Sequence, residues 1–121
     1  MEPEIVYTWE RRPEYRATLQ FSRSLGRVLA SLPRRVRWKC ERPLVRGATM
    51  IGIGIAGANA DPCPGELISC EEREAFRDAA LEAVRLCREG LETLRETGFG
   101  SRPDLLVTLE LLERIESGLK T

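Results

Sequence analysis

The sequence has 121 residues, of which 42% are hydrophobic and 31% charged, and its 19 basic and 19 acidic side chains give a formal net charge of zero. This balance excludes a disordered tail and a membrane protein, and the length is that of one small domain. No histidine occurs, which excludes Ser/His/Asp and Cys/His catalysis and every histidine-containing metal site. We therefore expect a helical binding or assembly module, not an enzyme, with no cofactor, no metal and no small-molecule substrate.

The first element in the chain is predicted to be an amphipathic helix from Glu14 to Leu32. Apolar residues recur there at the spacing of one helix face, and Pro33 ends the pattern because the residue before a proline avoids helical backbone angles. Residues 1–13 are polar and are predicted to be a lead-in to a single domain over residues 14–121. They show neither the basic start nor the apolar run of a signal peptide, and no apolar stretch is long enough to cross a bilayer. We expect a cytoplasmic protein.

A basic stretch opens the second segment, residues 34–60. Six cations and one anion fall between Arg34 and Arg46, and residues 1–60 carry a charge of +6 against −6 in the remainder. One interpretation is a phosphate-binding patch with an exposed tryptophan for base stacking. The other is a solvated segment that faces acidic helices of the same or a neighbouring subunit. Arg46 is expected to pair with an acidic residue of the third helix. The candidate nucleic-acid contacts are Arg34, Arg35, Arg37, Trp38, Lys39 and Arg42.

The second half of this segment is predicted to be a helix buried on nearly all sides, because its apolar residues cover every direction around the axis. Pro43 suits either the first turn of that helix or a kink. Four glycines lower its helix propensity, and close approach to neighbouring helices is the expected reason for them. The candidate packing residues are Ala48, Ile51, Gly52, Gly54, Ile55 and Gly57.

Residues 52–57 also match the pattern G-x-G-x-x-G, in which glycines let a dinucleotide pyrophosphate approach a helix N-terminus. No strand pattern precedes the motif, and the chain is short for a dinucleotide-binding domain. A small nucleotide-binding protein that uses Gly52, Gly54 and Gly57 is therefore the less favoured alternative.

The third helix carries the clearest start and stop signals in the chain. A proline-broken loop over residues 61–68 precedes Ser69, which together with Glu72 forms a predicted capping box. An apolar stripe then extends to Thr97, and Gly98 is placed to cap the C-terminus. The carboxylates of this helix alternate with arginines and are predicted to form a solvated face with ion pairs, since metal sites in helix bundles pair glutamate with histidine.

A fourth helix is predicted after a short glycine turn. Ser101 is its expected N-cap, Pro103 falls in its first turn, and residues 105–112 are apolar beyond one face, so the helix should touch two neighbours. Four helices with short connections and no strand pattern predict an all-α, up-down antiparallel four-helix bundle. The wide apolar faces further predict that it assembles with copies of itself.

The four cysteines, Cys40, Cys63, Cys70 and Cys87, fit no zinc or redox spacing. Cys87 falls on the apolar stripe of the third helix and is predicted to be a core residue. We interpret all four as reduced structural residues, with disulfides or a shared metal site as the less favoured alternatives.

Residues 43–58, PLVRGATMIGIGIAGA, resemble the second helix of the four-helix-bundle proteins encoded in intervening sequences of bacterial 23S ribosomal RNA genes. Arg46, Ala48, Ile51 and Ile55-Ala56 are similar to the arginine, alanine and aliphatic positions of that helix. Three positions depart from the family pattern: Met50 replaces a serine, Gly54 an asparagine and Gly57 a glutamate.

This family is in turn similar to the accessory variability protein of diversity-generating retroelements. The resemblance implies a homo-oligomer, a five-membered ring, with RNA or a reverse transcriptase as a further partner. The alternative that the sequence leaves open is a protein–protein adaptor without nucleic acid.

Overall fold

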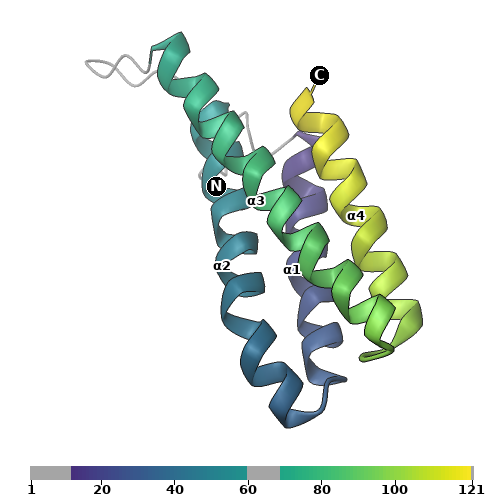
Figure 1. Ribbon diagram of the computed structural model, residues 1–121. Helices are drawn as coiled ribbons and strands as arrows, with labels where there is room; N and C mark the ends of the chain where they lie inside the picture. The colour runs from purple at the N-terminus through teal and green to yellow at the C-terminus, as the bar shows by residue number, and fades with distance from the viewer. Residues whose placement is uncertain (1–11, 60–68, 121) are drawn as a thin grey trace, which may run out of the picture.

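The computed structural model describes residues 12–59 and 69–120 and contains four helices there. Neighbouring helices along the chain are antiparallel, α2 packs along α3 and α1 along α4, and contacts between α1 and α2 and between α3 and α4 complete the bundle (Figure 1). This confirms the predicted all-α antiparallel four-helix bundle. The helices are α1 (Pro13–Ala30), α2 (Arg34–Ala58), α3 (Cys70–Thr97) and α4 (Arg102–Lys120).

Helix α1 ends at Ala30, two residues before the predicted boundary at Leu32, and Pro33 separates the two helices as predicted. Ser31 caps the C-terminus of α1, and Pro33 is the N-cap of α2. At the other end, α1 begins at Pro13, one residue before the predicted boundary, because proline suits the first helical position. The rest of the predicted lead-in, residues 1–11, lies outside the described residues.

Helix α2 runs without interruption from the basic stretch into the apolar stretch, through Pro43. The interpretation that Pro43 starts a helix is therefore wrong: nine helical residues precede it. Proline has no N–H group, so the carbonyl of Lys39 loses the helical hydrogen bond that residue 43 would otherwise donate. Packing of the long helix against α1 and α3 outweighs this local cost.

The predicted caps of α3 are both confirmed. The Ser69 hydroxyl accepts a hydrogen bond from the Glu72 N–H at 3.1 Å, and the Glu72 carboxylate accepts one from the Ser69 N–H at 3.3 Å. Gly98 ends the helix in the left-handed conformation, with φ at 78°. Helix α4 begins directly after Ser101. The predicted loop over residues 61–68 lies outside the described residues.

The core of the bundle is made of aliphatic side chains from all four helices around one phenylalanine. A buried polar contact joins two helices there: the hydroxyl groups of Ser24 on α1 and Thr108 on α4 are 2.6 Å apart. None of the described helices is both long enough and apolar enough to span a membrane. The most fully buried large side chains are Phe21, Val28, Ile51, Ile55, Val84, Leu91, Leu105, Leu112 and Ile115.

Candidate interaction surfaces

The six candidate nucleic-acid contacts are all exposed and all lie on the first nine residues of α2. The structure divides them between two sides of the helix. Four of them line a shallow depression on one side, namely Arg34, Arg35, Arg37 and Trp38, whereas Lys39 and Arg42 line a groove between α2 and α3. The Trp38 side chain is 85% exposed, so its ring is free to stack on a partner.

Most of these cations have no carboxylate neighbour in the described part of the chain. Only Arg37 has one, with its Nη2 atom 3.5 Å from a carboxylate oxygen of Glu41. The first turn of α2 contains no acidic residue, and its N-cap makes no side-chain hydrogen bond. The partial positive charge of the helix N-terminus therefore adds to the charge of Arg34 and Arg35.

Helix α2 is not buried on nearly all sides, so that prediction is wrong. The packing candidates Ala48, Ile51 and Ile55 face the core, but Met50 and Ile53 are 41% and 50% exposed. A helix in a four-helix bundle has neighbours on only part of its circumference, so a helix that is apolar all round leaves apolar side chains outside. The sequence contains a signal for this exposed surface: α2 has more apolar residues than one buried face can hold.

Two of the three candidate packing glycines lie against α3. A Cβ on Gly54 would come within 2.6 Å of the Ala80 side chain, and one on Gly57 within 2.3 Å of the Phe76 ring. A Cβ on Gly52 would instead meet only a methyl group of α1, at 3.9 Å. All three glycines lie inside a continuous helix and not on a loop before one, so they do not form the phosphate-binding turn that the nucleotide-binding alternative requires.

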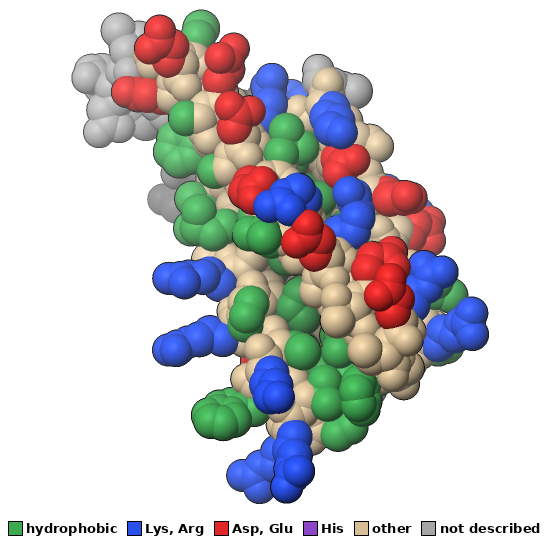
Figure 2. All heavy atoms as spheres, in the orientation of Figure 1, with side chains coloured by type: hydrophobic (Ala, Val, Ile, Leu, Met, Phe, Trp, Pro, Cys, Tyr) green, Lys and Arg blue, Asp and Glu red, His purple; other side chains and the backbone are tan. Residues whose placement is uncertain are grey.

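An open groove of about 720 Å³ separates the exposed edges of α2 and α3. Leu86 on α3 is 53% exposed and faces the groove together with Met50 of α2. In Figure 2, hydrophobic side chains follow this seam, while cations project from one half of α2 and carboxylates gather at the opposite end, on α3. We call this surface the α2–α3 face. Its apolar lining includes Pro43, Leu44, Met50, Ala79, Ala83 and Leu86.

Arg46 lies on this face, and its predicted ion pair with the third helix does not form. Its side chain is exposed, lines the groove and makes no ion pair with a described residue. Met50, Leu86 and Arg46 were absent from the candidate site residues, because the approach of α2 to α3 that places them together depends on tertiary packing.

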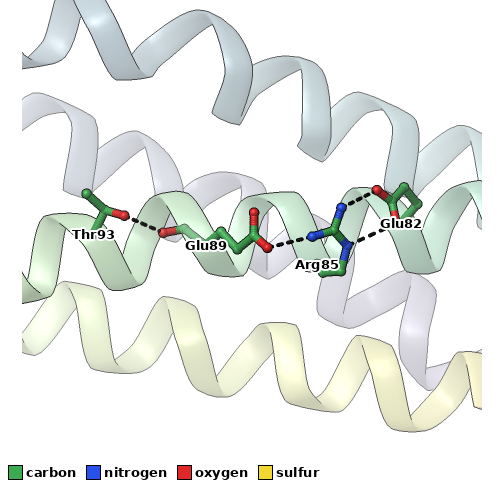
Figure 3. Close-up of polar contacts among 4 residues, drawn as sticks. All are labelled: Glu82, Arg85, Glu89 and Thr93. Carbon is green, nitrogen blue, oxygen red and sulfur yellow. Dashed lines mark hydrogen bonds and ion pairs between the residues drawn. The ribbon is translucent and has the colours of Figure 1, made fainter.

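The carboxylates of α3 on this face are partly neutralised within their own helix. The Arg85 guanidinium donates hydrogen bonds to Glu82 at 2.5 and 3.1 Å and to Glu89 at 2.5 Å, and the Thr93 hydroxyl donates to the Glu89 carbonyl at 2.9 Å (Figure 3). These contacts raise the pKa of Arg85, and the hydrogen bonds from Arg85 lower the pKa of Glu82. Asp78, one turn earlier, has no such partner among the described residues.

The described thiols differ in their burial. Cys87 is buried, as predicted, against Gly47, and burial raises the pKa of its thiol to about 11. Cys40 and Cys70 are free, and Cys63 lies outside the described residues. Over residues 12–59 and 69–120, no three histidine, cysteine or acidic side chains come together as metal ligands.

No protein-family model matches this chain, and no curated protein matches it either. The fold established by the structure is that of a four-helix all-α protein.

Proposed function

We propose that this protein is a non-enzymatic module that works by self-association of its helical bundle. The observation that carries the proposal is the apolar α2–α3 face, on which Met50 and Leu86 line one groove and are 41% and 53% exposed. Exposed apolar side chains gathered on one face are typical of interaction sites, whereas scattered ones are not. The histidine-free sequence and the protonated Cys87 support a role without catalysis.

Light scattering or sedimentation of the purified protein tests this proposal. We expect association at micromolar concentration, and we expect Met50→Gln with Leu86→Gln to weaken it because both substitutions remove apolar area from the contact. Leu106 and Val107 of α4, which are equally exposed, provide a matched control pair for substitution by glutamine. A strict monomer would contradict the proposal.

The resemblance of residues 43–58 to the 23S intervening-sequence proteins extends the proposal to a five-membered ring with a structured RNA or a reverse transcriptase as partner. A ring joins two different surfaces of each subunit, whereas a two-fold contact joins one surface to itself. The mass of the assembly in solution therefore distinguishes these arrangements. An adaptor for another protein would instead be monomeric alone.

RNA binding by the basic end of α2 is the second candidate function. It is favoured by the exposed Trp38 ring and by Arg34 and Arg35, which have no ion pair with a described residue. Filter binding of a structured RNA at low and high salt tests it. Each phosphate contact should contribute a slope of about −0.7 in log affinity against log salt for a single strand.

The variant for this test is Arg34→Glu/Arg35→Glu/Arg37→Glu, and the control is Arg23→Glu/Arg27→Glu on α1. We expect the α2 variant alone to lose binding and the steep salt dependence. Equal, weak binding by the wild type and both variants would contradict the nucleic-acid role.

A further inference from the structure

We infer that the α2–α3 face is an isologous interface, on which a second copy of this chain docks in antiparallel orientation about a two-fold axis. The inference rests on the proposed self-association, commits to its two-fold arrangement in place of the five-membered ring, and specifies its surface and charge contacts. The face combines an apolar centre with two oppositely charged rows that extend from that centre in opposite directions.

The apolar centre is the part of the groove between Met50 of α2 and Leu86 of α3, which both line it. Both side chains are about half exposed, and behind them Gly47 and Ala83 bring the two helices close together. Each copy therefore presents a shallow apolar depression with a long side chain on either edge. Two such depressions placed face to face can bury these four side chains against one another.

A basic row leads away from the centre along the N-terminal half of α2. Counted back from Met50, its cations come 4, 8, 11 and 15 residues earlier. At 100° per residue these spacings keep all four on one side of the helix. None of them makes an ion pair with a described residue. The basic row is Arg46, Arg42 and Lys39, which line the groove, and at its far end Arg35, which lines the depression beside Trp38.

An acidic row with nearly the same spacing leads away from Leu86 along the N-terminal half of α3. Its carboxylates come 4, 8, 12 and 15 residues before Leu86. Arg77 directly precedes Asp78 in the sequence, but the two residues are about 100° apart around the helix axis, so Arg77 is not part of this row. Of the row, only Glu82 is paired with an arginine of α3 in the described residues. The acidic row is Glu71, Glu74, Asp78 and Glu82.

Because α2 and α3 are antiparallel, the two rows point to opposite ends of the bundle, as the blue and red side chains in Figure 2 show. A two-fold axis in the plane of the interface, midway between Met50 and Leu86, lays the basic row of each copy over the acidic row of the other. Equal spacing places Arg42 of one copy opposite Asp78 of its neighbour, and the nearly equal spacing of the next pair places Lys39 close to Glu74. The face is therefore complementary to itself, which is what an isologous contact requires.

The face is also large enough for a stable dimer. Helices of 25 and 28 residues are about 40 Å long, and two side by side are about 20 Å wide. The resulting area is on the order of 800 Å² per copy, which is the area that each partner contributes to a standard interface.

A charge-reversal exchange tests the inference. One variant is Lys39→Glu/Arg42→Glu, and the other is Glu74→Lys/Asp78→Arg, all at exposed positions without an ion pair to a described residue. Each variant alone should dimerise about tenfold more weakly or worse, because like charges then face each other. An equimolar mixture should form the heterodimer, since both rows are complementary again, and all four substitutions on one chain should restore the homodimer.

Sedimentation velocity and native mass spectrometry measure these species, and circular dichroism checks that each variant is folded. Arg23→Glu/Arg27→Glu, which makes the same charge change on α1, should leave the wild-type dimer intact. Lys39→Gln/Arg42→Gln is a milder second variant, expected to weaken the dimer and reduce its sensitivity to salt.

The possible failures separate the two proposals. If the wild type associates but neither reversal changes its association, the interface lies elsewhere, and the inference fails while self-association stands. If both reversals weaken association but their mixture does not restore it, the two rows do not meet, and the inference fails. A monomeric wild type overturns the inference and the proposed function together.

Discussion

Gly54 of α2 lies directly against Ala80 of α3, so that a Cβ added to the glycine would be 2.6 Å from the Ala80 Cβ and 2.7 Å from the Phe76 carbonyl oxygen. Close-packed helices have no room for that methyl group. We expect Gly54→Ala to lower the free energy of unfolding by about 1–3 kcal/mol, because overpacking outweighs the better helix propensity of alanine. Urea unfolding followed by circular dichroism measures this change.

Gly52, two residues earlier, is the control for that experiment. A Cβ there would meet only the Thr18 methyl group, at 3.9 Å. Gly52→Ala should therefore raise the free energy of unfolding by up to about 1 kcal/mol through helix propensity alone. The same sign of change at both positions would contradict the close packing of α2 on α3.

The hydroxyl pair between α1 and α4 should show strong coupling. The Thr108 hydroxyl donates to the Asp104 carbonyl at 2.6 Å, which leaves its oxygen to accept from Ser24. Thr108→Val removes that acceptor and leaves the buried Ser24 hydroxyl without its partner, at a cost of about 1–3 kcal/mol. Ser24→Ala should cost about 0.5–1.5 kcal/mol, because the Thr108–Asp104 hydrogen bond survives.

The double variant provides the decisive comparison. Ser24→Ala/Thr108→Val has no unpaired hydroxyl, so its loss of stability should be smaller than the sum of the two single losses. A double-mutant cycle in urea measures the difference. Strictly additive losses would show that the two hydroxyl groups do not depend on each other.

The features predicted correctly from the sequence are those set by neighbouring residues. The capping box at Ser69 and the left-handed Gly98 are fixed within a few residues of chain, and the apolar stripes of α1 and α3 follow from helical spacing. The path of α2 through Pro43 was not predictable in the same way. Local preference favours a break there, and packing along α3 overrides it.

The α2–α3 face shows the same limit. The basic residues were recognisable as a charged stretch, but their division into two sides of one helix required knowing that the stretch is helical. The exposure of Met50 and Leu86 required knowing how closely α2 approaches α3. That distance is set by Gly47, Gly54 and Gly57, whose role depends on residues of another helix.

The ion pair between α3 and α4 should make stability depend on pH in the acid range. Arg88 donates a hydrogen bond to Glu116 at 2.9 Å, and this contact, with help from Lys120, lowers the pKa of Glu116 below 4.5. A carboxyl group whose pKa is lowered on folding adds stability at pH values above its pKa in the unfolded chain. That stability is lost as the pH falls through its pKa in the folded protein.

We therefore expect Glu116→Gln to cost up to about 1 kcal/mol at neutral pH, since the pair is only partly buried. The difference from the wild type should shrink below about pH 4.5. Glu113→Gln, an exposed change in the same helix, should have little effect at either pH. Thermal or urea unfolding over a pH series measures both differences, and a constant difference for Glu116→Gln would contradict the ion pair.

The buried thiol of Cys87 should make the protein less stable at alkaline pH. Burial raises its pKa from 9.0 to about 11. Between these values the Cys87 thiol ionises in the unfolded chain but keeps its proton in the folded protein. The contribution of this thiol to stability is therefore complete below about pH 9 and declines until about pH 11. Relative to Cys87→Ala, the wild type should lose roughly 2–3 kcal/mol of unfolding free energy across this range.

Cys70→Ala removes an exposed thiol and should follow the wild-type profile. Parallel profiles for the wild type and Cys87→Ala would show that the Cys87 thiol ionises as readily in the folded protein as in the unfolded chain.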